Sequence, residues 1–300
     1  MRKLETWFNI ILVSTGILDL IVLTTSAATE KGKYEAECHP TPNSLSQVYI
    51  LGYGSLLNTA SKNTTYPNTG INIPVNVTGF SRNFNCKGTP VGHSTTYLGV
   101  DVANSTTSFN GVVFKLRDYQ SLLEFDKREV FYCRKLVPLE DIQFLIDKSW
   151  NATVEQDFPV GNAQFWIYDV KPEFLGWPSE RYPIVQTYVD VFLAGCIEIE
   201  ETYNLTGYKD ACITSTQGWE YPWVNDRLIP RRPFLHTWKA FQIDRLIQSH
   251  FPKHFDQVLI EKEAKYNFNN KNGSNKKVIG NYLQTLFLAI LLIVPVTGTI

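Results

Sequence analysis

Two apolar segments at the ends of the chain decide which part of it builds a folded core. The first follows Met1-Arg2-Lys3, covers residues 7–23 and precedes the small residues Ser26-Ala27-Ala28. Basic residues, an apolar stretch and a small-residue cleavage site are typical of a secretory signal peptide, so we predict one at residues 1–28. An uncleaved N-terminal anchor is the alternative.

The second segment is an apolar tail that ends the chain. Asn272-Gly273-Ser274 is followed by a polar spacer and then by apolar residues 283–296. This order is typical of a glycosylphosphatidylinositol (GPI) signal, so we predict attachment at Asn272, a polar stalk over 261–277 and a removable tail over 278–300. A single C-terminal transmembrane helix is the alternative, although the tail is short for one. Either reading attaches the protein to a membrane through its C-terminus.

Glycosylation motifs between the two ends agree with export. Five asparagines of the folded part stand in Asn-X-Ser/Thr sequences: Asn63, Asn76, Asn104, Asn151 and Asn204. The motif is an acceptor for N-glycans on surface loops of secreted proteins. We therefore expect the chain to enter the secretory pathway and to reach the extracellular face of the plasma membrane.

Charge and cysteine content exclude several classes of protein. Lys plus Arg number 28 and Asp plus Glu 29, which argues against binding nucleic acid through phosphate neutralisation. No two cysteines have the short spacing of a zinc site, so we expect no metal and no cofactor. In an oxidising compartment we expect one or two disulfides, of open connectivity, with one thiol left over from the set Cys38, Cys86, Cys133, Cys196 and Cys212.

The middle of the chain alternates short β-rich runs with helical patterns. Strands are predicted at residues 47–53, 71–77, 95–100, 110–116, 130–137 and 162–169. Helices are predicted at 118–129, at 184–200 and at 233–251, the last with Leu235, Trp238, Phe241 and Leu246 facing inward. These elements indicate an α+β domain over 45–235, with a core at 47–140, an extension at 160–235 and a helical segment at 236–260.

Two local features carry candidate chemistry. The first predicted strand ends in Tyr53-Gly54-Ser55-Leu56, where consecutive backbone N–H groups can hold an anion. A glycine that only permits a tight turn is the plainer interpretation. Glu129 stands at a helix-to-strand junction before Tyr132, where a glutamate is most often paired with a nearby cation such as Arg128 or Arg134.

The order and spacing of several motifs resemble the gamma-glutamylcyclotransferase-like family. The similar part covers residues 48–137 and contains Tyr53-Gly54-Ser55-Leu56, Gly79-Phe80-Ser81-Arg82, Tyr97-Leu98-Gly99-Val100, Asn110-Gly111-Val112-Val113-Phe114 and Phe125-Asp126-Lys127-Arg128-Glu129 with Tyr132. A second block, which includes residues 186–190 and 214–231, is similar to a C-terminal extension found in a bacterial branch of that family.

The resemblance implies a small mixed β-barrel with flanking helices and a cavity for a small γ-glutamyl substrate. By motif position, Glu129 is its single catalytic acid and base, and Tyr53, Gly54, Ser55 and Leu56 form the binding loop with Tyr132 nearby. The implied reaction turns a γ-glutamyl amide or peptide into 5-oxoproline and a free amine. A non-catalytic cell-surface binding protein on the same fold is the alternative.

The second block allows two interpretations. Trp223, Asn225, Asp226 and Arg227 combine aromatic and polar side chains that can line the leaving-amine side of the cavity. In the other interpretation the block is a structural cap, in which the tryptophans pack and Asp226 pairs with Arg227. A thiol hydrolase that uses Cys86 or Cys133 with His93 is a third functional reading, without a local signature.

Overall fold

The computed structural model describes residues 37–43, 47–88, 94–231, 237–255 and 259–260. The predicted signal peptide, stalk, apolar tail and Asn272 lie outside these residues. Within them, no helix is both long enough and apolar enough to cross a membrane.

The first of two mixed sheets contains the strand that leads to the candidate binding loop. Its order is β6-β8-β1-β5-β2-β7, and β1 is central, antiparallel to β5 and parallel to β8. All five residues of β1 are buried, as expected for a β-rich run with a neighbour on each side. The strands are β1 (Val48–Gly52), β2 (Ile73–Thr78), β5 (Ser108–Lys115), β6 (Tyr132–Val137), β7 (Ile142–Phe144) and β8 (Gln164–Val170).

The second sheet combines the long β3–β4 hairpin with short strands from the extension. Its order is β10-β3-β4-β9-β11-β12, and only β3 and β4 pair antiparallel. The strands are β3 (Phe80–Gly88), β4 (Thr95–Val102), β9 (Ile184–Val185), β10 (Thr216–Gln217), β11 (Trp223–Asn225) and β12 (Leu259–Ile260). The extension therefore continues the sheet begun by residues of the family-like core.

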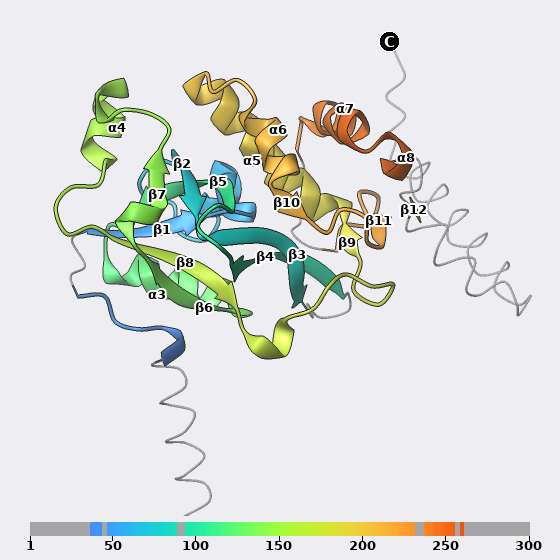
Figure 1. Ribbon diagram of the computed structural model, residues 1–300, viewed down its shortest axis with the longest axis horizontal. Helices are drawn as coiled ribbons and strands as arrows, with labels where there is room; N and C mark the ends of the chain where they lie inside the picture. The colour runs from blue at the N-terminus through green and yellow to red at the C-terminus, as the bar shows by residue number, and fades with distance from the viewer. Residues whose placement is uncertain (1–36, 44–46, 89–93, 232–236, 256–258, 261–300) are drawn as a thin grey trace, which may run out of the picture.

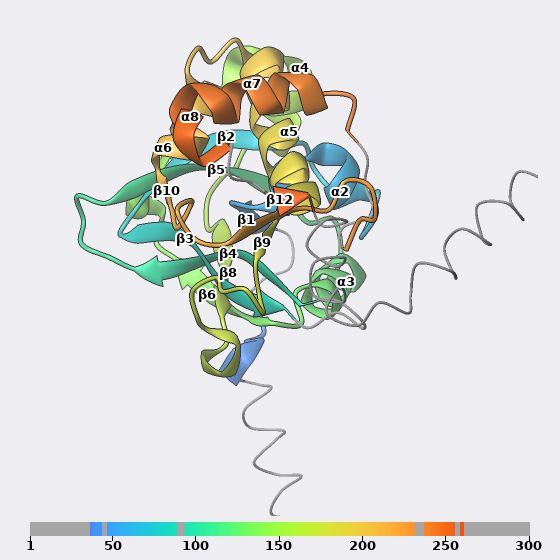
Figure 2. The ribbon, with the colours of Figure 1, turned by 90° about the vertical axis from the view of Figure 1, so that its right-hand side faces the viewer.

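The helices complete the α+β fold, and the predicted class is confirmed. α5 and α6 lie side by side, and α7 lies against α5 (Figures 1 and 2). The α-helices are α2 (Thr59–Asn63), α3 (Tyr119–Arg128), α4 (Ala152–Asp157), α5 (Gln186–Tyr203), α6 (Tyr208–Thr214), α7 (Ala240–His250) and α8 (Pro252–Phe255). Short 3₁₀ helices are η2 (Ser55–Leu57), η3 (Leu139–Asp141), η4 (Lys148–Trp150) and η5 (Pro172–Phe174).

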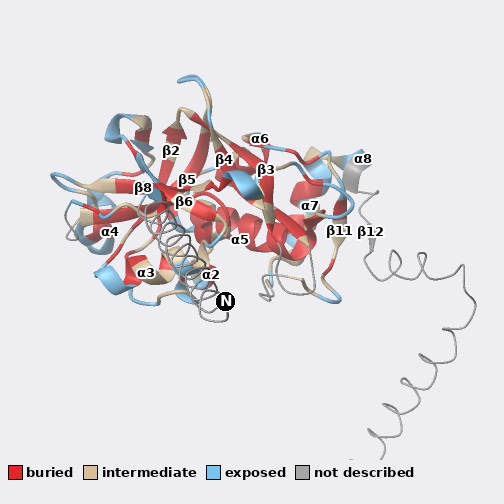
Figure 3. Ribbon diagram, turned by 90° about the horizontal axis from the view of Figure 1, so that it is seen from below, coloured by how far each residue is buried: buried red, intermediate tan, exposed pale blue. Residues whose placement is uncertain are grey.

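The hydrophobic core fills the space between the sheets and α5. In Figure 3 the strands and α5 are mostly buried, whereas α3 and α4 each turn one side to solvent. α5 is buried over most of its length because it contacts η2, α6, α7, β9 and β11. The helix that the sequence predicted at 184–200 is thus a central element of the fold.

Two predicted helices differ from the structure at their starts. Residues 184–185 form β9, and α5 begins at Gln186 and continues to Tyr203. α7 begins only at Ala240, and its buried face consists of Ile243, Leu246 and Ile247. Trp238 and Phe241 are exposed, so their predicted inward orientation is wrong. The buried residues recur at helical spacing only from Ile243 onward, which sets the orientation of the helix.

Candidate active site

A cavity of about 230 Å³ lies where the binding-loop motif, the end of α3 and the start of β6 meet. It brings together all six site residues predicted for the γ-glutamyl substrate: Tyr53, Gly54, Ser55, Leu56, Glu129 and Tyr132. The remaining lining comes from Leu51, Tyr97, Leu98, Arg128, Val130, Phe131, Tyr168 and Tyr188.

The end of α3 places Glu129. The Asp118 side chain accepts a hydrogen bond from the Ser121 N–H at 2.7 Å and so caps the start of the helix. At the other end, the Glu129 N–H donates to the Phe125 carbonyl and the Glu129 carbonyl accepts from the Tyr132 N–H, both at 2.9 Å. These bonds hold Glu129 at the helix-to-strand junction that the sequence predicted.

Glu129 is a largely buried carboxyl with one cationic partner. Its side chain is 14% exposed, and its Oε1 lies 3.1 Å from Nε of Arg128. Burial raises the pKa of Glu129 above its usual value, and the neighbouring Arg128 limits that rise. Arg134, the other candidate partner, binds Asp126 at 2.7 Å instead. The pairing expected of a plain structural glutamate is therefore present, but within a cavity.

The loop after β1 needs glycine at residue 54 because another side chain approaches it closely. A Cβ atom built on Gly54 would stand 2.7 Å from the hydroxyl of Tyr188. The interpretation of this residue as a turn-former only is thus incomplete.

A buried arginine holds the backbone at the start of this loop. The buried guanidinium of Arg82 donates from Nη1 to the carbonyls of Tyr53 (3.2 Å) and Asn110 (2.7 Å). Ser55 and Leu56 begin η2, and the first N–H groups of a helix have no carbonyl partner within it. These N–H groups can donate hydrogen bonds to a carboxylate of a ligand.

Tyrosines form most of the polar wall. Tyr53 donates its hydroxyl proton to the Tyr168 carbonyl at 2.6 Å, and Tyr132 donates to the Leu98 carbonyl at 2.8 Å. The hydroxyl of Tyr188 accepts from the Leu98 N–H at 3.1 Å. Burial raises the pKa of Tyr53 and of Tyr132 well above the usual value, so both phenols are neutral at physiological pH.

Three of these wall residues were not predicted as site residues. Tyr97 belongs to β4, Tyr168 to β8 and Tyr188 to α5. Their spacing in the sequence fits buried faces of a strand or a helix, which is also how each is packed. Tyr97 and Tyr188 stand in segments that carry the family resemblance, but only the contact between distant elements places all three tyrosines at the cavity.

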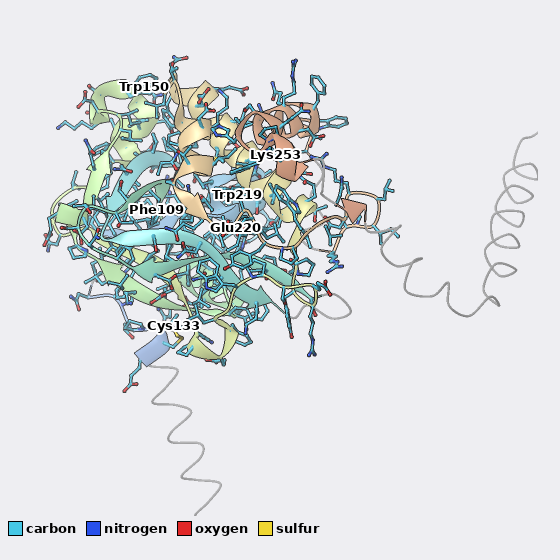
Figure 4. The ribbon with its side chains drawn as sticks, turned by 45° about the vertical axis from the view of Figure 1, so that its right-hand side comes forward. Phe109, Cys133, Trp150, Trp219, Glu220 and Lys253 are labelled. Carbon is cyan, nitrogen blue, oxygen red and sulfur yellow. A yellow bond between two sulfur atoms is a disulfide. The ribbon has the colours of Figure 1, made fainter. Side chains whose placement is uncertain are left out.

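The second block lies away from this cavity. None of Trp223, Asn225, Asp226 and Arg227 is among its lining residues within the described part of the chain. Trp223 packs on Trp219, which is labelled in Figure 4, with ring centroids 5.6 Å apart, and both side chains belong to the hydrophobic core. The predicted contribution to the leaving-amine side is therefore not seen, and the cap interpretation describes the tryptophans.

The charged residues of the second block pair differently from the expected Asp226–Arg227 pair. Arg227 binds the carboxylates of Asp190 on α5 (2.6 and 2.7 Å) and Asp244 on α7 (2.7 and 2.9 Å). Asp226 is fully buried and accepts from the N–H and hydroxyl of Thr187 in the first turn of α5. A carboxylate at a helix N-terminus is stabilised by the helix dipole, so both residues hold helices in place.

The cysteines do not form a thiol-hydrolase site among the described residues. Cys133 forms a disulfide with Cys38, and Cys196 forms one with Cys212. Cys86 is free and buried, and burial raises its pKa to about 12, which keeps it as an unreactive thiol. His93 lies outside the described residues.

The described residues contain no group of three or more His, Cys, Asp or Glu that could hold a metal ion. Of the five glycosylation asparagines, Asn63, Asn104, Asn151 and Asn204 are exposed. Asn76 is half-buried on β2, between β5 and β7. The first four are thus accessible positions for a glycan.

Comparison with known proteins gives likenesses of fold at low identity. No family model and no curated protein sequence matches the chain. A gamma-glutamyl cyclotransferase structure is 13% identical, with 68% of this chain and 99% of that chain covered and a TM-score of 0.41. An uncharacterized human protein is 13% identical, with 67% of this chain and 97% of that chain covered and a TM-score of 0.40. A gamma-glutamyl cyclotransferase specific to glutathione from yeast is 15% identical, with 57% of this chain and 98% of that chain covered and a TM-score of 0.36. At these TM-scores the likenesses carry no argument about chemistry, which depends on the residues of this chain.

Proposed function

We propose that the cavity at Glu129 converts a γ-glutamyl amide or peptide into 5-oxoproline and a free amine. The observation that carries this proposal is a single buried carboxylate beside a loop of open N–H groups, in a cavity whose other polar side chains are mainly neutral tyrosines. Such a site can hold one end of an anionic substrate and move one proton, which is what this ring closure requires.

The reaction needs little beyond geometry and a proton carrier. The α-amine of the substrate attacks its own γ-carbonyl carbon, so a ring C–N bond forms while the C–N bond to the leaving amine breaks. Because nucleophile and electrophile belong to one molecule, fixing their orientation supplies much of the rate. No oxidant, reductant or second substrate is consumed.

Glu129 would carry the proton. The attacking amine begins as an ammonium and ends as the lactam N–H, so it loses two protons, and the departing nitrogen must receive one. A carboxylate within hydrogen-bond reach of both nitrogens can take one of the two protons and pass it to the departing nitrogen, while the other proton is released to solvent. Its raised pKa brings its affinity for the proton closer to neutral pH, which suits both directions of transfer.

The loop after β1 would bind the substrate's α-carboxylate. The N–H groups that begin η2 offer donors, and the Ser55 hydroxyl lies beside them at the cavity wall. An N–H of the same loop directed at the γ-carbonyl oxygen would also stabilise the charge that develops there.

Replacing the carboxylate tests the proposal. In the full chain, Glu129→Gln keeps the shape of the side chain but cannot transfer the proton, so kcat for 5-oxoproline release should fall by about 10² to 10⁴-fold. The measurement is 5-oxoproline release from γ-glutamyl peptides and γ-glutamyl amines. Glu124→Gln is a matched control, because Glu124 is a partly exposed glutamate of the same helix bound to Lys127.

The pH profile adds a second readout of the same residue. Glu129 must be ionised to accept the proton, and its pKa is raised above 4.5 by burial. Activity of the wild type should therefore rise with pH, with its acidic inflection above that of an ordinary glutamate. Undiminished release by Glu129→Gln would contradict the mechanism, and a folded wild type that releases nothing would favour a binding protein on this fold.

We also propose that the protein acts outside the cell, attached to the membrane by its C-terminus. The targeting patterns at both ends of the sequence support this, as do four exposed asparagines in glycosylation motifs. Two disulfides add support, since they persist in oxidising compartments.

A further inference from the structure

Every nitrogen atom of the Arg128 side chain faces a partner on the protein. Nε forms an ion pair with Glu129 at 3.1 Å, and Nη1 donates to the Ser61 carbonyl and the Thr65 hydroxyl, both at 2.7 Å. Nη2 donates to the hydroxyls of Ser55 and Ser61, both at 2.9 Å. These four hydrogen bonds use all four N–H donors of Nη1 and Nη2. The guanidinium is therefore directed at the protein and not at a substrate.

These four hydrogen bonds and one ion pair join three segments of the candidate site. Glu129 ends α3, Ser55 begins η2 in the binding loop, and Ser61 belongs to α2, with Thr65 just beyond it. Because the guanidinium is planar and rigid, fixing it on α2 also fixes the directions of its bonds to Glu129 and Ser55. The proposed base and the proposed binding loop are thus held by one group.

We infer that Arg128 is a positioning residue for the proposed reaction: it orients the Glu129 carboxylate and the Ser55 hydroxyl together and does not itself bind the substrate. The inference rests on the proposed function of the cavity, and it names a residue that the motif comparison left as a simple ion-pair partner.

The bond to Ser55 sets the role of its hydroxyl. The Ser55 oxygen accepts a hydrogen bond from Arg128, so the hydroxyl keeps its own proton as a donor. Ser55 lines the cavity, where that proton can meet a carboxylate of the substrate. A donor that itself accepts from a cation is strengthened, because linked hydrogen bonds polarise one another.

The bond to Glu129 sets the charge balance of the cavity. The titratable groups that interact with Glu129 from other elements are all neutral at physiological pH, because burial raises the pKa of each: Tyr53, Cys86, Tyr132, Tyr168 and Tyr188. Among the described lining residues, Arg128 is the cationic one, and it opposes the effect of burial on the pKa of Glu129.

Three variants of the full chain separate the charge of Arg128 from its geometry. Arg128→Met removes both, Arg128→Lys keeps a cation but loses the fork of donors, and Thr65→Val removes one anchor and leaves the guanidinium in place. Lys127→Met is the control, because it removes a neighbouring positive charge that is exposed and bound to Glu124. The readouts are the pH profile of 5-oxoproline release and the NMR titration of the Glu129 carboxyl carbon.

In Arg128→Met, kcat/KM should fall by roughly 10 to 100-fold because the reacting groups lose their alignment. Its acidic limb should move to higher pH, and the NMR titration of Glu129 should move with it. In Arg128→Lys the acidic limb should return toward that of the wild type, while KM stays about tenfold raised because the ammonium cannot replace a bidentate fork. Lys127→Met should match the wild type in both readouts.

An Arg128→Met protein whose acidic limb and Glu129 titration match those of Lys127→Met would overturn the inference. If Arg128→Met does not fold, Thr65→Val decides: the inference requires a raised KM with an unmoved acidic limb, and an unchanged KM contradicts it. A wild type without activity would refute the proposed function alone. The NMR titration would still show whether Arg128 controls Glu129.

Discussion

Gly54 and Tyr188 show how one residue of the binding loop depends on a distant helix. The tyrosine hydroxyl occupies the space that a side chain at residue 54 would need, and it also accepts the hydrogen bond of the Leu98 N–H. The loop therefore comes close to α5 only because residue 54 has no Cβ. This close approach, and not a left-handed backbone angle, is what requires glycine here.

A double-mutant cycle should reveal this contact. We expect Gly54→Ala to lower the free energy of unfolding by about 1–3 kcal/mol through overpacking. Tyr188→Phe should cost about 1–3 kcal/mol, since it leaves the Leu98 N–H without its acceptor. The double variant should lose less than the sum, because removal of the hydroxyl makes room for the new methyl group. Urea unfolding measures all three, and additive losses would show that the two residues do not interact.

At the scale of single residues, the sequence predicted the candidate site residues better than the side chains that surround them. Glu129 and the loop from Tyr53 to Leu56 are contiguous motifs, so their positions follow from local order alone. Tyr188 reaches the cavity through the packing of α5 on η2, which no local pattern encodes. Arg128 was visible only as a neighbour of Glu129, and its bonds to α2 depend on the fold.

Among the elements, α5 connects the extension to the candidate active site. Asp226 caps its start, Arg227 binds Asp190 in its second turn, and Tyr188 on its first turn lines the cavity. Asp226 and Arg227, which the sequence suggested as pocket residues, therefore do not line the cavity. They hold α5, which supplies Tyr188 to the cavity wall.

The charged cluster on α5 should affect stability more than substrate choice. Arg227→Met leaves the buried Asp190 and the partly exposed Asp244 without their cation, so the free energy of unfolding should fall by about 3 kcal/mol. KM for γ-glutamyl substrates should stay within twofold. Arg245→Met is the control, because Arg245 is an exposed arginine on α7 that lies over the Phe241 ring.

Denaturant unfolding and steady-state kinetics measure these two effects. A changed order of preference among leaving amines in Arg227→Met, at unchanged stability, would support the second-block pocket that the sequence predicted.

Element boundaries were predictable where the burial of an element follows a simple pattern along its own sequence. β1, which is buried at every residue, and α3, which has one buried face, match their predicted positions. The predicted start of α7 was wrong because it relied on Trp238 and Phe241, which are apolar but exposed. Hydrophobicity alone does not indicate which side of a helix is buried.

On the scale of the whole molecule, two disulfides link the elements that carry Tyr132 and Tyr188 to other segments of the chain. Cys38–Cys133 joins the N-terminal segment to β6, next to Tyr132, and Figure 4 shows Cys133 beside that segment. Cys196–Cys212 joins α5 to α6. Cross-links of this kind limit the unfolded chain, and they suit a protein that works outside the cell.

The proposed export and anchoring have a direct test in eukaryotic cells. A phospholipase C specific for phosphatidylinositol should release the protein from intact cells, because the membrane attachment would be a lipid at Asn272. Asn272→Gln, with Gly273 and Ser274 also replaced by bulky residues, should abolish that release. A glycosidase that removes N-glycans should lower the apparent mass. Protein that stays on the membrane after phospholipase treatment would indicate the C-terminal transmembrane helix instead.

The place of Tyr188 in the cavity also sets when during synthesis the wall of the cavity becomes complete. Ribosomes make the binding loop and Glu129 well before α5, and Tyr188 meets Leu98 across 90 residues of sequence. A nascent or proteolytically shortened chain that lacks α5 would thus carry its carboxylate beside an unfinished wall. Under the proposed function, activity would come only once α5 has packed on the loop after β1.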